Sequence, residues 1–248
     1  MKKLCILFFT LALPLQTFAA LSFTDGSSNN VNYGSGSSLD NLHEHTLIMW
    51  LYVRSLTASN RIVASKEVNS ATTFDKQWQI RSSGQLDTFM NTSGTDATAR
   101  SNTGAGNVVY AGQWFYIVFS MSSSMVPRLY LGTATTTVKE VSYVTQTTGT
   151  GSPTDESASN FILGNNQLLA RAGNFDIAYV QYINRELSLG ELRSLQYRPR
   201  FVTGTRLLSF PGFNRTGTQT DYSGFGNSGT VTGATLSLPT PPIRFWGL

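Results

Sequence analysis

The chain has 248 residues, of which 40% are hydrophobic, 12% aromatic and only 13% charged, and its formal net charge is +4. This composition excludes a disordered chain and is sufficient to build a sizeable core. The basic residues are scattered and form no run that could neutralise phosphates, which argues against nucleic acid as a partner. Cys5 is the single cysteine, so the chain has no disulfide of its own and no cysteine-based metal site.

The first residues have the pattern of an export signal. Lys2 and Lys3 form a positive start, residues 4–13 are almost wholly apolar, and residues 17–19 (TFA) form a small-x-small cleavage site. The apolar stretch is short for a bilayer, which needs ~20 residues, so an uncleaved membrane anchor is the weaker alternative. We predict a signal peptide at 1–20, a secreted or extracellular protein on a cell or particle surface, and no membrane insertion after cleavage.

Short apolar segments separated by glycine, serine, threonine and asparagine predict an all-β protein. Residues 47–53 (LIMWLYV) and 114–121 (WFYIVFSM) are apolar almost throughout, which predicts strands covered on both faces. Residues 174–183 alternate, which predicts one face formed by Phe175, Ile177, Tyr179 and Gln181. Further strands are predicted at 61–65, 78–81, 86–90, 128–131, 161–163, 207–210 and 230–238, with a glycine-containing turn at 82–85.

One short helix is predicted near residues 188–197. Ser188 and Glu191 have the spacing of a capping box, in which the serine caps the first turn and the glutamate reaches back. Leucines follow at 189, 192 and 195, and Pro199 sets the end of the helix.

Several segments, taken in order, resemble the laminin-G-like (concanavalin-A-like jelly-roll) family. The opening LSFTDG (21–26) and VNYG (31–34) resemble its first hairpin, and WQI followed by GQL (78–86) resembles its middle hairpin. The remaining similar segments are GQWFYIVFS (112–120), RLYLG (128–132), FILG (161–164) and DYSG…TVTGA (221–234). The resemblance implies a two-sheet antiparallel β-sandwich, since two packed sheets bury such strands.

The resemblance also implies a division of the chain. The sandwich domain is expected at 21–200, and residues 201–248 are expected to form a C-terminal hairpin and a Pro-rich tail packed on the sandwich. Phe245 and Trp246 in that tail are expected to dock on the sandwich, on a partner or on another protomer.

The same resemblance implies a structural calcium as the one candidate cofactor. In related sandwiches the aspartate that corresponds to Asp176 helps to bind calcium with groups of the first hairpin, here Asp25 and the carbonyl of Gly26. Calcium favours such mixed carboxylate and carbonyl shells. The alternative is that Asp176 only accepts backbone hydrogen bonds.

No catalytic pattern emerges from the sequence. A glycanase needs two carboxylates facing each other across the sugar, but no E-x-D-x-E pattern is present, and acids such as Asp40, Glu67, Asp75 and Asp87 lie apart. The sequence has no G-x-S-x-G elbow. Residues 43–45 (HEH) suggest a metal site, but no third ligand is placed, so a solvated loop is predicted.

We therefore predict a secreted, non-catalytic recognition module that binds carbohydrate or an extracellular protein. The first alternative is a structural assembly subunit, such as a virion decoration or a filament component, and a homo-oligomer is compatible with either. A glycan-degrading enzyme is the third hypothesis. Binding residues are not predicted, because recognition loops carry specificity in unpatterned residues.

Overall fold

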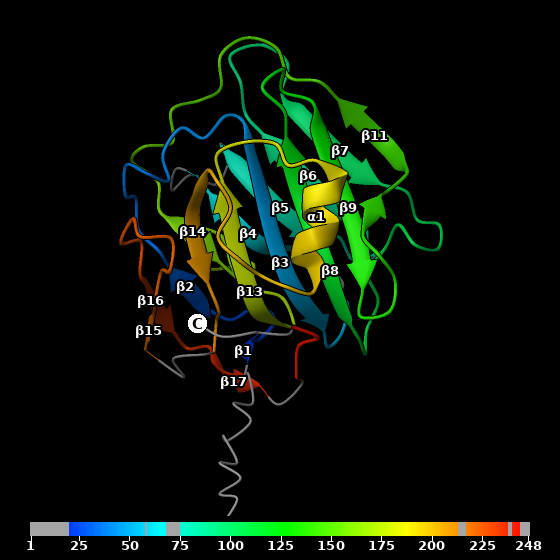
Figure 1. Cartoon of the computed structure of the whole chain (residues 1–248), viewed down its shortest axis with the longest axis vertical. Coiled ribbons are helices and arrows are strands. Elements are labelled where there is room, and N and C mark those ends of the chain that lie inside the picture. The colour runs from blue at the N-terminus through cyan, green and yellow to red at the C-terminus, as the bar shows by residue number, and fades with distance from the viewer. Residues whose placement is uncertain (1–19, 58, 68–74, 213–216, 238–239, 244–248) are drawn as a thin grey trace, which may run out of the picture.

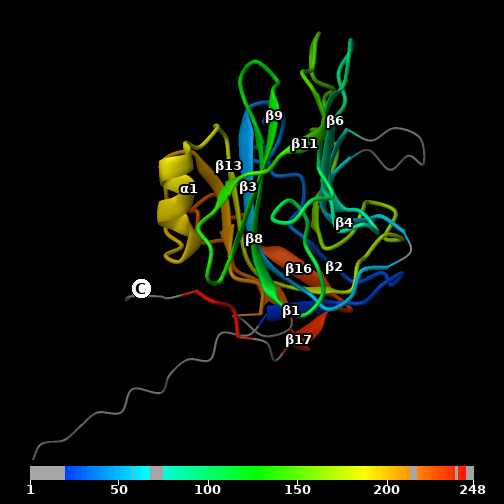
Figure 2. The same ribbon diagram turned by 90° about the vertical axis from the view of Figure 1, so that its right-hand side faces the viewer.

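Two antiparallel β-sheets packed face to face form the protein, as predicted (Figures 1 and 2). The computed structural model describes residues 20–57, 59–67, 75–212, 217–237 and 240–243. The predicted signal peptide, except Ala20, and the tail aromatics Phe245 and Trp246 lie outside the described residues. Within those residues no helix is both long and apolar enough to span a membrane.

The first sheet, called here the helix-covered sheet, contains eight strands in the described part of the chain. In spatial order these are β10 (Lys139–Glu140), β9 (Pro127–Thr133), β8 (Trp114–Met121), β3 (His45–Val53), β13 (Phe175–Ile183), β1 (Ala20–Phe23) and β17 (Thr235–Ser237), and β14 (Thr205–Ser209) also pairs with β13.

The second sheet contains nine strands within the same described residues. In spatial order these are β11 (Tyr143–Thr147), β7 (Ala97–Ser101), β6 (Leu86–Met90), β5 (Lys76–Ile80), β4 (Arg61–Lys66), β12 (Phe161–Leu163), β2 (Asn30–Asn32), β16 (Gly229–Thr232) and β15 (Thr218–Gln219).

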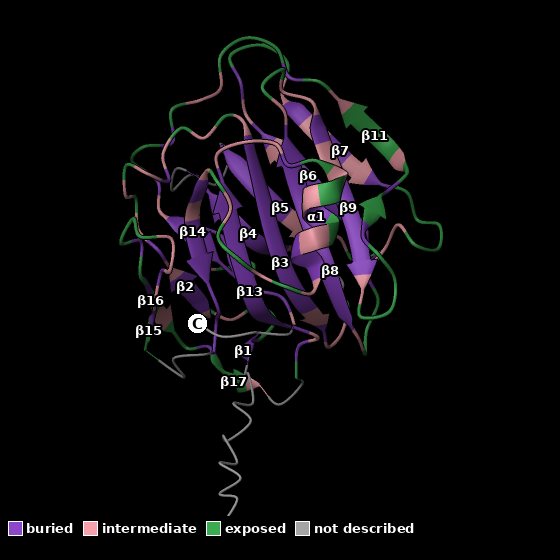
Figure 3. Cartoon of the chain, viewed as in Figure 1, coloured by how far each residue is buried: buried purple, intermediate pink, exposed green. Residues whose placement is uncertain are grey.

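The two apolar segments form β3 and β8, which are neighbours in the helix-covered sheet. Their inward side chains, such as Met49 and Ile117, join the core between the sheets, while outward ones, such as Trp50 and Tyr116, join a second core under helix α1 (Leu189–Gln196). Figure 3 shows β3, β8 and β13 buried along most of their length. Cover on both faces is confirmed, and it comes from the second sheet on one side and from α1 with the C-terminal segment on the other.

Helix α1 begins with the predicted capping box. The Ser188 hydroxyl accepts from the Glu191 backbone N–H (3.3 Å), and the Glu191 carboxylate accepts from the Ser188 backbone N–H (2.9 Å). The helix packs on β3, where the buried indole of Trp50 donates to the Gln196 carbonyl (2.7 Å). This bond satisfies a polar group that would otherwise be costly to bury.

The alternation predicted for β13 holds only for its first half. A register irregularity between Ile177 and Tyr179 marks a bulge at Ala178. Beyond it, Val180 and Tyr182 point into the core between the sheets, whereas Tyr179 points toward α1. One extra residue reverses every later side chain, so the predicted face containing Tyr179 is wrong.

Two pairing predictions are also wrong, because the chain crosses between the sheets. β1 pairs with β13 and β17, whereas β2 pairs with β12 and β16, so these strands form no hairpin. The strand predicted at 230–238 is two strands, β16 and β17, in different sheets. The crossing occurs at Gly233, whose φ of +67° turns the chain where a side chain would strain it.

Candidate functional site

One end of the sandwich gathers loops that carry several arginines, of which Arg171 is exposed and the others are half-buried. The strand register places the last residues of β3 beside the first residues of β8 and β13, and the first residue of β4 beside the last of β5. The loops that connect these strands therefore meet at one end. We call this the arginine end, and it comprises residues 54–57, 59–61, 81–85, 102–113 and 164–174.

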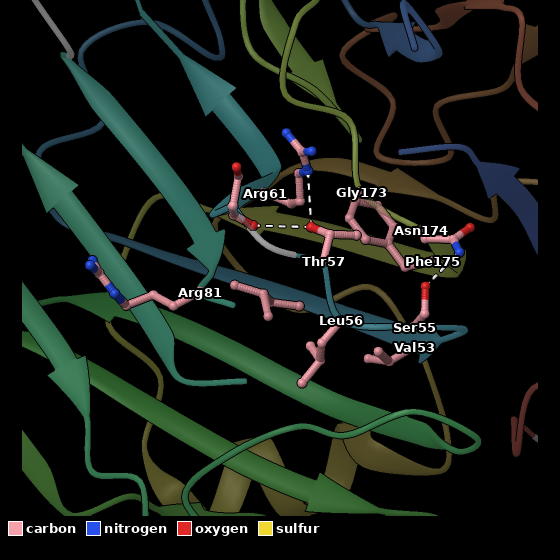
Figure 4. A pocket seen from close by; sticks show the side chains of 11 residues that line it. Val53, Ser55, Leu56, Thr57, Arg61, Arg81, Gly173, Asn174 and Phe175 are labelled. Atoms are coloured by element: carbon pink, nitrogen blue, oxygen red, sulfur yellow. Dashed lines mark hydrogen bonds between the residues drawn. The ribbon is translucent and has the colours of Figure 1, made fainter. Parts of the chain in front are cut away.

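A small pocket opens between the sheets at the arginine end (Figure 4). Its apolar floor is made by Val53, Ile80 and Phe175, and Leu56 and Asn174 line its sides. The free volume of about 10 Å³ is room for about one water molecule. The pocket is therefore too small to hold a sugar ring.

A larger, open hollow adjoins this pocket and shares Ser59 and Arg61 with it. Its volume is about 460 Å³, within the range of sites for small ligands, which runs from roughly 300 to 1,000 Å³. The lining is mainly polar, and consists of Ser59, Asn60, Arg61, Ala170 and Arg171. We call this feature the Arg61–Arg171 hollow.

The Arg61 side chain is held in place by contacts of its Nε. The Nε–H donates to the Thr57 hydroxyl (3.1 Å) and pairs with the Asp25 carboxylate. Figure 4 shows the guanidinium pointing away from Val53 and Leu56. Within the described residues its terminal nitrogens donate no hydrogen bond, and the side chain is 18% exposed.

The loop that carries Arg171 is fixed by Asn165. The Asn165 side-chain carbonyl accepts from the Arg171 backbone N–H (2.7 Å), and its amide donates to the carbonyls of Ser27 (3.0 Å) and Asn29 (3.1 Å). The Arg171 carbonyl in turn accepts from the Ile62 backbone N–H (3.0 Å). These bonds attach Arg171 directly to the strand that begins with Arg61.

An apolar element lies at the same end. The ring of Tyr110 is 54% exposed and stands edge-on to Phe115, with centroids 5.2 Å apart. Its loop is attached to the β5–β6 turn through a bond from the Val109 backbone N–H to the Gly84 carbonyl (2.8 Å). Because Phe115 holds the Tyr110 ring, the ring offers a pre-positioned aromatic surface.

A further arginine cluster lies on the outer face of the second sheet. Asp87 accepts from both Arg81 (2.6 Å) and Arg100 (3.1 Å). Each of these pairs is partly exposed and contributes about 1 kcal/mol or less. The two arginines compensate the charge of Asp87.

The residues predicted to hold calcium have arginine partners instead. Asp176 lies buried in β13, where it pairs with Arg54 (3.4 Å) and accepts from the Ser237 hydroxyl (2.7 Å). Asp25 is exposed and pairs with Arg61. Gly26 has a φ of +66° and is exposed in the same loop as Asp25. The carboxylates that the resemblance assigns to calcium are thus each paired with a guanidinium group, and thermal unfolding tests whether calcium can displace these arginines.

Calcium binding can be tested by thermal unfolding. We expect calcium chloride at about 5 mM to leave the melting temperature unchanged. The reason is that the Arg54 guanidinium already forms an ion pair with the buried Asp176 carboxylate. A calcium-dependent rise that disappears in Asp176→Asn would instead establish the predicted site. Asp96→Asn, at the opposite end, is the matched control.

Residues 43–45 lie at the opposite end, and the predicted solvated loop is wrong for His45. This residue begins β3, is buried, and packs its ring against Trp78 and Tyr182 at centroid distances of 5.4 and 5.5 Å. Burial lowers the pKa of His45 to about 3, so the ring is neutral. The described residues contain no group of three or more His, Cys, Asp or Glu placed to hold a metal.

The opposite end also contains a buried ionic group that sequence reasoning missed. Lys66 donates to the Asp40 carboxylate (2.8 Å) and to the Ser159 carbonyl (2.6 Å). Lys76, its cross-strand neighbour, donates to the Glu156 carboxylate (2.5 Å). We call Asp40, Lys66, Lys76 and Glu156 the lysine cluster. It fixes the connection before β12 to the inner face of the second sheet.

Glu67 is a buried acid at the end of β4. Burial raises its pKa, but one carboxylate oxygen accepts from Gln77 and the other from the Gln167 backbone N–H (3.2 Å). The side chain is therefore held within the protein and does not face an open cleft.

Comparison with known proteins assigns the chain to a superfamily. A sequence profile of the concanavalin A-like lectin/glucanases superfamily matches residues 25–193. The chain belongs to this superfamily. No curated protein sequence matches the chain.

The chain is also similar to proteins of known structure. A candidate carbohydrate-binding protein from Bacteroides ovatus is similar at a TM-score of 0.59 and 13% identity, over 93% of this chain and 62% of that one. A Trypanosoma rangeli sialidase has a TM-score of 0.48 and 12% identity, over 70% of this chain and 26% of that one. A heptameric pentraxin from Limulus polyphemus has a TM-score of 0.42 and 10% identity, over 74% and 77%. The chain spans about three fifths of the Bacteroides protein, and identities this low show the fold alone.

Proposed function

We propose that this superfamily member is a secreted, non-catalytic module that binds carbohydrate at the arginine end. The observation that carries the proposal is the open, polar Arg61–Arg171 hollow on a lectin-like sandwich. The similarity to a candidate carbohydrate-binding protein supports the same reading.

The groups around the hollow suit the hydroxyls of a sugar. Asn60 offers an amide donor and acceptor, Ser59 a hydroxyl, and Arg61 a guanidinium with available N–H groups. The exposed ring of Tyr110 adds an apolar surface at the same end for the C–H face of a sugar. A protein partner would need a much larger contact, about 800 Å² on each side, so a glycan is the better match to a hollow of this size.

The arrangement of the acids supports a binding role rather than hydrolysis. Glycoside hydrolysis needs two carboxylates about 5–9 Å apart across an open cleft. At the arginine end Asp25 pairs with Arg61, and on the neighbouring sheet face Asp87 lies between Arg81 and Arg100. These pairs hold the carboxylates away from the roles of proton donor and nucleophile.

A glycan array probed with the chain from residue 20 onward tests the proposal. We expect binding to at least one glycan class, and we expect Asn60→Ala to weaken that binding about tenfold, the cost of one or two lost hydrogen bonds. Asn91→Ala, which removes the same amide at the opposite end, should bind as the wild type does. Absence of binding to every glycan on the array would refute the proposal, and release of reducing sugar from the bound glycan would replace it with an enzyme.

An assembly role is favoured by one observation at a sheet edge. β11 is the edge strand of the second sheet, and its Val144 side chain is 59% exposed. Unprotected edges of this kind can pair with another chain. Light scattering after size exclusion distinguishes the two roles, because a binding module is expected as a small species and an assembly subunit as a large one.

A further inference from the structure

We propose that the Arg61–Arg171 hollow selects sugars that carry a carboxylate, such as a uronic or sialic acid residue. This inference rests on the proposed carbohydrate-binding function and names the ligand class of the same site. It follows from the charge of the hollow, from the planar shape of its cationic groups and from the rigidity of the backbone that holds them.

The charge of the hollow is positive and small. Arg61 and Arg171 both line it, and Asp25 compensates Arg61. Arg171 is exposed and has no ion pair within the described chain, although the buried Glu67 feels its field. One uncompensated guanidinium calls for one negative charge on the ligand. A densely sulfated chain would bring more negative charge than the hollow can match.

The shape of the cationic groups favours a carboxylate. A guanidinium presents parallel N–H donors in a flat fork that matches the two oxygens of a carboxylate, and such paired bonds are stronger than bonds between neutral groups. Arg61 uses only its Nε for internal contacts, so its terminal nitrogens remain for a ligand. Asn60 and Ser59 lie in the same lining and suit the neutral hydroxyls of the same sugar.

The backbones of the two arginines are also joined by hydrogen bonds. The backbone of Arg171 is bonded through its N–H to Asn165 and through its carbonyl to Ile62, which directly follows Arg61. A ligand therefore does not have to order the backbone of Arg171 when it binds, which lowers the entropic cost of binding.

Titration calorimetry with matched acidic and neutral glycans tests the inference. The probes are oligogalacturonate with its methyl ester, sialyllactose with lactose, and a sulfated glycan with its unsulfated form. We expect a carboxylated probe to bind at least tenfold more tightly than its neutral partner, and to lose affinity as sodium chloride rises.

Variants of Arg171 distinguish the contribution of the paired guanidinium N–H donors from that of the positive charge alone. Arg171→Gln should reduce affinity for the carboxylated probe at least tenfold, and Arg171→Lys should recover only part of it, because lysine keeps the charge and loses the paired donors. Arg193→Gln, an identical charge change on exposed α1, should leave affinity unchanged. Unchanged melting temperatures show that each variant is folded.

Three other outcomes of the calorimetry would overturn the inference, and the last of them would also overturn the proposed function. Equal binding of acidic and neutral partners would overturn the inference and leave the carbohydrate-binding function intact. Tighter binding of the sulfated probe would overturn the choice of carboxylate. Binding of no glycan at all would overturn the proposed function and the inference together.

Discussion

Replacement of Glu156 by alanine is expected to lower the free energy of unfolding by about 3–5 kcal/mol, the usual cost of breaking a buried ion pair. Glu156 and Lys76 are each 1% exposed and lie 2.5 Å apart. Burial lowers the pKa of Lys76, and the charge of Glu156 is the main effect opposing that shift. Without the carboxylate, Lys76 would either remain charged without its partner or lose its proton, and both states are unfavourable.

Urea unfolding of matched variants measures this effect. Asp155→Ala removes the neighbouring carboxylate, which is exposed and bonded to Asn41, and should lower the stability far less than Glu156→Ala does. The double variant Lys76→Met, Glu156→Leu should recover most of the stability, because apolar residues of similar volume often replace a buried pair without loss. A loss below about 1 kcal/mol for Glu156→Ala would show that the lysine cluster does not stabilise the fold.

Acidification from pH 6.5 to pH 5 is expected to cost about 2 kcal/mol through His45 alone. Burial, with a smaller effect from Lys76, lowers the folded pKa of His45 from 6.5 to about 3. Between these values the unfolded chain binds a proton that the native chain does not bind. The contribution of His45 is therefore fully present above pH 6.5 and is lost progressively as the pH falls toward 3.

Denaturant unfolding at several pH values isolates this contribution. His45→Asn retains a donor near Leu42 but cannot titrate, so its stability should depend on pH less steeply than that of the wild type between pH 5 and 6.5. His43 is the other histidine, and its pKa is also lowered, chiefly by burial. His43→Asn should retain most of the slope. Equal slopes for wild type and His45→Asn would contradict the assignment.

Elements with a strong local signal could be predicted from the sequence. The segments that form β3 and β8 are apolar on both faces, and both strands are buried on both faces in the structure. Helix α1 follows its capping box. By contrast, β7 was not predicted, because its inward residues are the small Ala97 and Ala99 and its outward ones are polar. The bulge at Ala178 could not be predicted either, because residues 174–183 alternate in sequence as they would in a regular strand.

The candidate site could not be predicted, for a physical reason. Arg61 and Arg171 are far apart along the chain, and they line one hollow because the Arg171 carbonyl accepts from the Ile62 backbone N–H in β4. Nothing in a single sequence distinguishes these arginines from solvated ones. The lysine cluster was missed for the opposite reason, since Lys66 and Lys76 have the composition of a surface strand and are fully buried.

The crossing at Gly233 has a consequence for how the chain can be divided. The last strands are the partners of the first: β16 pairs with β2 in one sheet, and β17 pairs with β1 in the other. A fragment that stops at residue 200 would keep the whole superfamily match yet leave β1 and β2 each with one unpaired backbone edge. Unpaired strand edges can pair with other chains, so we expect such a fragment to self-associate more readily than a chain that retains β16 and β17.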